Sequence, residues 1–155
     1  MPGLKGNLRK ALLKDVPQIR KLLQGYAKKG LLLDVPIAEL YEQIRSFRVY
    51  SEKGKLKGCC SLRIFYPGLG EIRSLAVEKR SQLRGIGSAL VGSCEEEAKS
   101  FGIKEIFTLT YVPGFFRKQG FRKAKKEKLP QKVWAYCINC PKFPDCDEKP
   151  MLKRL

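Results

Sequence analysis

EIRSLAVEKRSQLRGIGSALVGSCEEEAKSF, residues 71–101, decides the fold of this chain. The pattern predicts a strand, then a basic turn with two glycines, then an amphipathic helix. Gly85 and Gly87 lack a Cβ atom, so backbone N–H groups in the turn can approach a ligand closely. The N-terminus of the helix adds free N–H groups and a partial positive charge at the same place. The stretch therefore predicts an anion-binding turn that suits a diphosphate, with Arg80 and Arg84 at its rim.

Composition is typical of a folded domain outside the membrane. The chain has 155 residues, of which 43% are hydrophobic and 10% aromatic, so it can bury a core within one domain. It contains no apolar run long enough to span a bilayer. The first ten residues, MPGLKGNLRK, lack the apolar core of a secretory signal, so we expect a cytoplasmic protein. The sequence has no histidine, which excludes imidazole acid–base chemistry and histidine-ligated metal.

The net charge of +17, from 32 Lys and Arg against 15 Asp and Glu, favours polyanionic partners. Residues 117–126 form the one dense basic run, which is most simply a solvated face. A nucleic-acid-binding module is a competing hypothesis for this charge, and it would bind in a salt-sensitive way. We disfavour it because it gives the glycine turn and the strand before it no purpose.

The six cysteines divide into two groups. Cys59, Cys60 and Cys94 fall on apolar faces and are interpreted as small core residues. The tail holds the rest, with a CxxC pair at 137 and 140 and a further cysteine at 146. This spacing is typical of metal knuckles, but a fourth ligand is missing, so free thiols and a Cys137–Cys140 disulfide stay as alternatives and we assign no metal.

The remaining elements follow from periodicity and turn residues. Strands are predicted over residues 7–13, 48–51, 57–66, 71–77 and 106–111, from Phe121 onward, and over residues 151–155. The strands at 48–51 and 57–66 are predicted to form a hairpin that turns at residues 52–55. Helices are predicted from a cap at Asp15 to Gly30, over residues 37–46, from Gly87 to Gly102 and from Pro113 to Gly120. Tyr41 and Phe101 are expected to point inward. In the tail, residues 130–136 fit a helix, but KVWAYCI, residues 132–138, fits a strand equally well. The order predicts an α/β fold with a mixed sheet covered by helices.

Three segments carry a family resemblance: GEIRSLAV at residues 70–77, Q-x-x-G-x-G at 82–87 and PGFFRKQGF at 113–121. In this order they resemble the GCN5-related N-acetyltransferases, and within that family the short bacterial N-acetylglutamate synthases. The resemblance implies a mixed central sheet of about six to seven strands flanked by about four helices. It also implies that residues 1–155 are a single N-acetyltransferase domain, with the cysteine-containing tail, 137–155, completing the sheet.

The resemblance implies acetyl-CoA as cosubstrate. The turn would hold its diphosphate, the first signature strand would pair with its pantetheine arm, and a backbone N–H near Leu75 would polarise the acetyl carbonyl. The residues assigned to the cofactor in this way are Leu75, Ala76, Val77, Gln82, Leu83, Arg84, Gly85, Ile86, Gly87, Ser88 and Phe116.

The same resemblance implies direct attack of an amine on the thioester, without a side-chain nucleophile. Glu71 is the candidate base that takes the amine proton through water, although it also fits an exposed strand end or a partner of Arg73. Many relatives carry a general-acid tyrosine where this chain has Phe116, so the proton for the leaving thiolate comes from Tyr111 or from water. Tyr111 otherwise packs beside the cofactor arm.

For the acceptor, the resemblance favours the α-amino group of an amino acid, above all L-glutamate, as in arginine biosynthesis. Arg73, Arg63 and Lys132 are the candidate partners of its carboxylates, and each also fits a surface charge. Relatives often carry an arginine in the loop where this chain has residues 34–36, DVP, which weakens the case for glutamate. Another small amine or a peptide N-terminus is the alternative acceptor. Relatives also suggest a homodimer, which the sequence does not decide.

Overall fold

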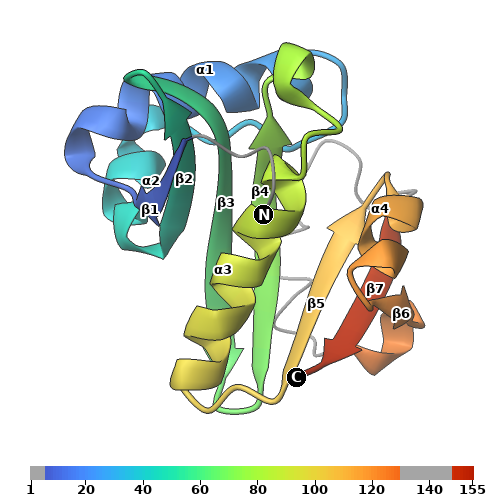
Figure 1. Ribbon diagram of the computed structural model, residues 1–155. Coiled ribbons are helices and arrows are strands. Elements are labelled where there is room, and N and C mark those ends of the chain that lie inside the picture. Colours follow the sequence, from blue (N-terminus) through green and yellow to red (C-terminus); the bar gives the residue numbers. More distant parts are fainter. Residues whose placement is uncertain (1–5, 130–147) are drawn as a thin grey trace. The chain divides into compact units, whose positions relative to one another are not determined.

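The computed structural model describes residues 6–129 and 148–155 (Figure 1). Seven strands form one mixed sheet in the order β1-β2-β3-β4-β5-β7-β6. The strands are β1 (Asn7–Lys10), β2 (Phe47–Glu52), β3 (Lys55–Tyr66), β4 (Leu69–Val77), β5 (Glu105–Thr110), β6 (Arg122–Lys123) and β7 (Lys149–Arg154). The α-helices of the described part are α1 (Val16–Ala27), α2 (Ile37–Glu42), α3 (Ile86–Ser100) and α4 (Pro113–Lys118). The predicted α/β fold is confirmed. Within the described ranges, no helix is long and apolar enough to cross a membrane.

The chain divides into two compact units. Unit 1 lies within residues 1–62 and 72–97, and unit 2 lies within residues 63–71 and 98–155. The long strands β3 and β4 and the helix α3 each contribute residues to both units.

Unit 1 is built on the antiparallel pairing of β1 with β2 and of β2 with β3. The β2–β3 hairpin turns through Lys53 and Gly54, whose φ angles are 50° and 78°. Two central residues with positive φ are the mark of a type I′ turn, whose twist matches that of the strands it joins. The hairpin predicted at residues 52–55 is therefore confirmed.

The α1 and α2 helices cover one face of the unit 1 sheet. Apolar residues at helical spacing in α1, together with Leu40 and Ile44 around α2, pack against residues from β2, β3 and β4. The buried residues of this core are Val16, Ile19, Leu23, Leu40, Ile44, Phe47, Val49, Leu56, Cys59 and Ala76. Asp15 precedes α1, but its side chain makes no capping hydrogen bond to that helix, so the predicted cap is wrong. Its carboxylate instead accepts the Leu12 N–H and pairs with Arg9.

The α3 helix covers the opposite face, along β3 and β4 (Figure 1). Its first turns approach β3 so closely that a Cβ atom at Gly58 would lie 2.9 Å from Leu90 Cδ1 and 3.1 Å from Ile86 Cγ2. Cys60, next to Cys59 on β3, is hydrogen-bonded to Cys94 of α3, as expected where neighbouring strand residues point to opposite faces. Unit 1 is therefore a sheet with helices on both faces.

Unit 2 contains the remaining strands. Residues 69–71 of β4 run parallel to β5, and β7 lies antiparallel between β5 and β6. Phe65, Leu69, Phe107 and Leu129 form a buried cluster. The β7 strand pairs with both β5 and β6. Residues 130–147, with Cys137, Cys140 and Cys146, lie outside the described residues.

Two aromatic residues expected to point inward are exposed. Tyr41 is 45% exposed because Leu40 and Ile44, four positions apart, already occupy the inner side. Phe101 is 62% exposed because α3 ends one residue before it. There Gly102, with φ of 80°, and the N–H of Ile103, which donates to the Ala98 carbonyl, close the helix as a Schellman motif. The predicted role of Gly102 at the helix end is confirmed.

We expect Gly58→Ala to destabilise the protein by about 1–3 kcal/mol, because the new methyl group overpacks the contact between β3 and α3. Gly25→Ala is the matched control: it lies inside α1, and a Cβ atom added there would have no neighbour within 4 Å, so the same change should stabilise by about 0.5–1 kcal/mol. Urea denaturation of both variants measures the two effects. Equal stabilities would show that α3 can retreat from β3 at no cost.

Candidate functional site

The glycine turn lies in unit 1 between β4 and α3. A short 3₁₀ turn, η3 (Lys79–Ser81), is followed by residues 82–85 and then by α3. The first bond within the helix runs from the Ala89 N–H to the Gly85 carbonyl, at 3.0 Å. The N–H groups of Ile86, Gly87 and Ser88 therefore precede the hydrogen-bonded ladder of the helix, at its positive end. The predicted strand, turn and helix are confirmed, with the helix starting at Ile86.

The backbone of the turn adopts two left-handed residues, Leu83 with φ of 67° and Gly85 with φ of 88°. Glycine adopts this conformation freely, whereas for leucine it costs about 1–2 kcal/mol. The Leu83 side chain is also fully exposed, at 105%, so no packing compensates for the strain. Strain of this kind is concentrated at ligand-binding segments.

One end of the turn is tied to α1 and β4 by side-chain hydrogen bonds. The Tyr26 hydroxyl donates to the carbonyl of Val77, the last residue of β4, and accepts from Gln82 Nε2 at 2.6 Å. Gln82 Nε2 also lies 3.4 Å from the Val77 carbonyl. The sequence assigned Tyr26 no role beyond its helical spacing. Its hydroxyl, among leucines and isoleucine, was the one signal of a polar role.

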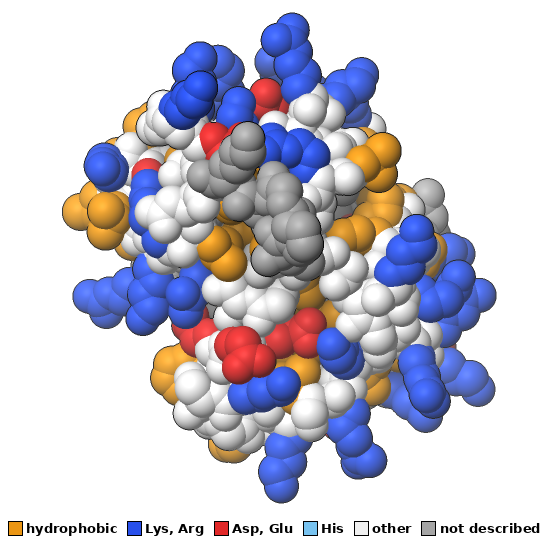
Figure 2. All heavy atoms as spheres, in the orientation of Figure 1, with side chains coloured by type: hydrophobic (Ala, Val, Ile, Leu, Met, Phe, Trp, Pro, Cys, Tyr) orange, Lys and Arg blue, Asp and Glu red, His pale blue; other side chains and the backbone are white. Residues whose placement is uncertain are grey.

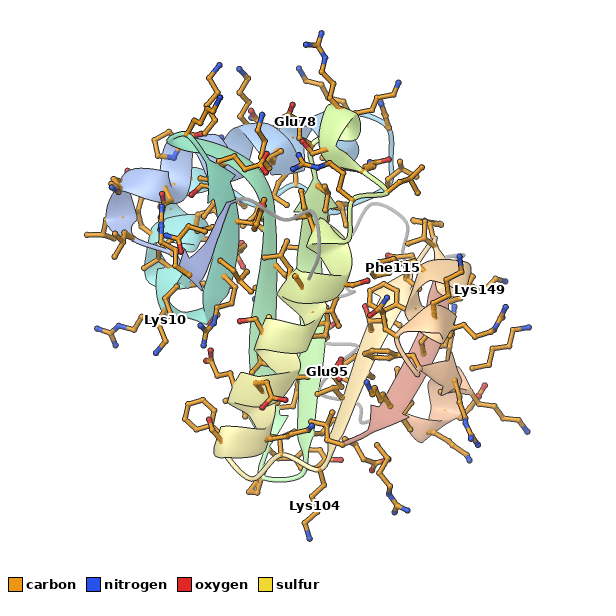
Figure 3. The ribbon with its side chains drawn as sticks, viewed as in Figure 1. Lys10, Glu78, Glu95, Lys104, Phe115 and Lys149 are labelled. Atoms are coloured by element: carbon orange, nitrogen blue, oxygen red, sulfur yellow. The ribbon has the colours of Figure 1, made fainter. Side chains whose placement is uncertain are left out.

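Two charged residues on either side of Gln82 tie the turn to β3 and β2. Glu78, labelled in Figure 3, donates its N–H to the Lys57 carbonyl at 2.7 Å and pairs with Lys57 Nζ at 3.2 Å. Arg84 donates from Nη1 and Nη2 to the two oxygens of Glu52, at 2.9 and 2.6 Å. The hydrogen bond from Arg84, assisted by one from Tyr50, lowers the pKa of the Glu52 carboxyl to about 2. Sequence reasoning put Arg84 at the rim but did not find Glu52.

Strand β4 is irregular at Ser74, whose φ is 53°. Two side chains of β3 bind consecutive carbonyls there: Ser61 Oγ donates to Arg73 at 3.1 Å and Cys59 Sγ donates to Ser74 at 3.4 Å. Consecutive carbonyls facing the same neighbour are a local departure from the alternation of a regular strand, as in a bulge. The irregularity directly precedes Leu75, the residue predicted to polarise the acetyl carbonyl.

The candidate catalytic and acceptor residues divide between the units. Arg73 is half-buried on β4 in unit 1. In unit 2, Glu71 is only 6% exposed and lies opposite Phe107 of β5, and Arg63 and Tyr111 are half-buried. Glu71 is therefore not an exposed strand end.

Phe116 is buried in unit 2, with its ring edge-on to those of Phe115 and Phe121 at 5.0 and 5.2 Å (Figure 3 labels Phe115). A phenylalanine side chain has no acidic proton, so Phe116 does not act as the general acid. Lys132 lies outside the described residues.

The three described cysteines are buried free thiols, as the sequence predicted. Burial raises the pKa of Cys59 to about 12, and the hydrogen bond with Cys94, together with burial, raises the pKa of Cys60 well above its usual value. These thiols are therefore protonated and unreactive at neutral pH. In the described ranges, no group of three or more acidic or cysteine side chains could hold a metal ion.

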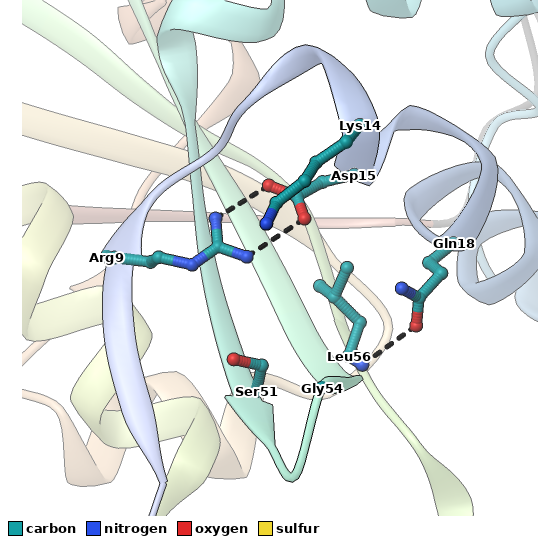
Figure 4. A pocket seen from close by; sticks show the side chains of 7 residues that line it. All are labelled: Arg9, Lys14, Asp15, Gln18, Ser51, Gly54 and Leu56. Atoms are coloured by element: carbon teal, nitrogen blue, oxygen red, sulfur yellow. Dashed lines mark hydrogen bonds and ion pairs between the residues drawn. The ribbon is translucent and has the colours of Figure 1, made fainter.

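A separate polar hollow of about 140 Å³ lies in unit 1, at the start of α1 and the β2–β3 hairpin (Figure 4). Arg9 and Asp15 form a two-bond ion pair at its wall, at 2.7 and 2.9 Å, and the hydrogen bond from Arg9 lowers the pKa of Asp15. On the Leu56 side, Gln18 accepts the N–H of Leu56 at 2.9 Å. These charged and amide groups satisfy one another, so we interpret the hollow as structural.

Positive charge is spread widely over the surface. Figure 2 shows Lys and Arg side chains mostly around the edge of the face that it presents, with acidic side chains nearer its middle. With a net charge of +17, the chain attracts anionic ligands in general, so the charge alone does not point to one site.

A model of the acetyltransferase (GNAT) family matches residues 17–121. The chain belongs to this family. It is an acetyltransferase, and acetyl-CoA is the acetyl donor that this fold uses. The resemblance that three sequence motifs indicated is confirmed.

Individual proteins similar to this chain include amino-acid acetyltransferases. An uncharacterized N-acetyltransferase of Chlorobaculum tepidum is 40% identical over 155 residues, which is the whole of both chains. An amino-acid acetyltransferase of Mycobacterium tuberculosis is 32% identical over 89% of this chain and 83% of that protein. The structure of an N-acetylglutamate synthase of Neisseria gonorrhoeae, complexed with coenzyme A and N-acetyl-glutamate, matches 97% of this chain with a TM-score of 0.88 and 28% identity. The chain spans 35% of that synthase.

We expect Tyr26→Phe to weaken acetyl-CoA binding about fivefold and to lower stability by about 1–2 kcal/mol, because the tether between the turn and β4 loses its hydroxyl. Calorimetric titration and urea denaturation measure the two effects. Tyr41→Phe, on the exposed side of α2, is the control and should change neither. Unchanged binding by the Tyr26 variant would show that the turn keeps its shape without this tether.

Proposed function

We propose that the chain transfers the acetyl group of acetyl-CoA to the α-amino group of an amino acid, with L-glutamate as the first candidate. The observation that carries this proposal is the turn at residues 82–88 in a chain that resembles a mycobacterial amino-acid acetyltransferase over 89% of its length. An N-acetylglutamate synthase with a TM-score of 0.88 supports the choice of glutamate. A place in arginine biosynthesis, a cytoplasmic location and action of residues 1–155 as a single domain are parts of the same proposal.

In this proposal the backbone N–H groups of residues 82–88 hold the diphosphate of acetyl-CoA. The left-handed Leu83 and Gly85 and the start of α3 at Ile86 support it, because together they gather N–H groups at a positive helix end. Leu75, Ala76 and Val77 would pair with the pantetheine arm. The irregularity at Ser74 supports this role, since a bulge changes the direction in which the following backbone groups point.

The reaction proposed is direct attack of the amine nitrogen on the thioester carbon. A C–N bond forms, the C–S bond breaks and coenzyme A leaves as a thiolate. The Leu75 N–H would stabilise the oxyanion that forms on the way. Holding amine and thioester in line would supply much of the rate acceleration.

Glu71 is the proposed base that takes the proton from the attacking amine. Its burial on β4 supports a role inside the protein. Three residues of β4 separate it from Leu75, so the proton would pass through water. Tyr111, half-buried after β5, is the proposed donor to the leaving thiolate, with water as the alternative.

The acceptor carboxylates are assigned to Arg73, Arg63 and Lys132. Arg63 and Arg73 are half-buried on adjacent strands, and the Arg63 Nη1 atom is shielded from solvent, so both differ from freely solvated surface arginines. Asp34, in the loop before α2, is exposed and acidic where relatives often carry an arginine, which weakens the case for glutamate but not for the amino-acid class. The alternative is transfer to another small amine or a peptide N-terminus.

A thiol-release assay with acetyl-CoA and a panel of amino acids tests the proposal. We expect turnover with L-glutamate above that with other amino acids. Turnover with glutamine or a neutral amino acid instead would keep the amino-acid class and change the acceptor. Acetyl-CoA binding without turnover of any amino acid would move the function to the alternative acceptors.

A second test addresses the base. Glu71→Gln should lower kcat by about 10²–10⁴ at neutral pH, because a protonated amine cannot attack. The deficit should shrink as the pH rises toward the pKa of the amine, where free amine is abundant without a base. Glu105→Gln, a carboxylate on β5 in the same unit, should leave the pH–rate profile unchanged. A pH-independent deficit at Glu71 would remove it from proton transfer.

A further inference from the structure

Arg84, in the turn, forms a two-bond ion pair with Glu52. Its guanidinium meets the Glu52 carboxylate through two parallel hydrogen bonds, from Nη1 to Oε1 and from Nη2 to Oε2. This fork geometry is the one that guanidinium groups also use to bind phosphate. The edge of Arg84 that would bind a phosphate is therefore already occupied by a carboxylate of the chain itself.

Glu52 is the fixed member of the pair. It is the last residue of β2, directly before the tight turn at Lys53 and Gly54. The Tyr50 hydroxyl donates to Glu52 Oε2 at 3.0 Å and itself accepts the Gly6 N–H at 2.7 Å. Tyr50 is fully buried, so this chain of bonds holds the carboxylate to the body of unit 1.

Arg84 is the member that can move. It lies between two left-handed residues of the turn, and its side chain is 37% exposed against 18% for Glu52. An exposed arginine side chain can rotate without opening the core, whereas Glu52 would have to break its bond to Tyr50.

We propose that Glu52 competes with the phosphate groups of acetyl-CoA for Arg84, so that exchange of Arg84 from the carboxylate to a phosphate is a step of cofactor binding. The inference rests on the proposed cofactor site at residues 82–88. As a competitor within the chain, Glu52 lowers the affinity for acetyl-CoA. Because the product coenzyme A carries the same phosphates, Glu52 also speeds its release. The diphosphate carries more negative charge than one carboxylate, which gives the exchange its direction.

The opposing possibility is that Arg84 stays on Glu52 and the pair only fastens the turn to the hairpin. The two cases predict opposite signs for the loss of the carboxylate. If Glu52 competes, removing its charge tightens coenzyme A binding; if it fastens the turn, removing it weakens binding.

Calorimetric titration with coenzyme A tests the proposal on the full chain. Glu52→Gln should tighten binding about two- to fivefold, the range that exposed ion pairs support. Arg84→Gln should weaken binding, and adding Glu52→Gln to it should bring no gain, because no guanidinium is left to release. A gain of the same size in both backgrounds would show a general field effect and overturn the exchange.

Glu97→Gln is the matched control, since Arg48 and Glu97 form another ion pair of unit 1 with the same 2.6 Å contact. Glu97 lies eleven residues beyond Ile86 on α3, about 16 Å along the helix, so its loss should leave coenzyme A binding unchanged. Glu52→Ala repeats the test should the glutamine retain a bond to Arg84. Circular dichroism confirms that each variant is folded.

Two ligands that lack some or all of the phosphates of coenzyme A complete the test. Pantetheine should bind the unaltered chain and Glu52→Gln equally, and a gain with pantetheine would overturn the proposal. With dephospho-CoA, a retained gain places Arg84 at the diphosphate and a lost gain places it at the 3′-phosphate; both support the exchange. Failure of the unaltered chain to bind coenzyme A would overturn the cofactor site together with this inference. Unchanged or weaker binding by Glu52→Gln, in a chain that does bind, would overturn the inference alone.

Discussion

The close approach of α3 to β3 at Gly58 is the contact on which the rest of unit 1 depends. A hydrogen atom in place of a side chain lets Ile86 and Leu90 reach the strand, and a Cβ atom there would also come within 3.3 Å of the Ala76 carbonyl. Because Ile86 is the first residue of α3, this contact sets where the helix N-terminus lies relative to β4. The position of the N–H groups at residues 86–88 is thus decided by packing inside unit 1 and not by the turn alone.

The turn itself combines backbone strain with side-chain ties. Leu83 and Gly85 take left-handed conformations, while Gln82, Glu78 and Arg84 reach α1, β3 and β2 respectively. Three elements distant in sequence therefore hold a segment whose own conformation is unfavourable. This arrangement is what a preorganised anion site requires, since amides that already point at the ligand need no ordering when it binds.

The sequence predicted what local chemistry decides. The strand, turn and helix of residues 71–101, the hairpin at 52–55 and the helix end at Gly102 all follow from neighbours in the chain. It could not predict Tyr26 as a tether or Glu52 as the partner of Arg84, because these contacts join residues 56 and 32 positions apart. The left-handed conformation of Ser74 was not predicted either, since a serine in a strand carries no local signal of a bulge. Tyr41 was misplaced because the inner side of α2 was already filled by aliphatic residues.

The buried thiols of Cys59, Cys60 and Cys94 have a practical consequence for spectroscopy of this enzyme. Disulfide reagents attack thiolates that they can reach. Burial keeps all three sulfurs out of reach, and it also raises the pKa values of Cys59 and Cys60. In the native protein, a chromogenic or fluorescent thiol reagent should therefore leave Cys59, Cys60 and Cys94 unlabelled. Any maleimide label that the native enzyme takes up can then be assigned to a cysteine other than these three, without an engineered substitution.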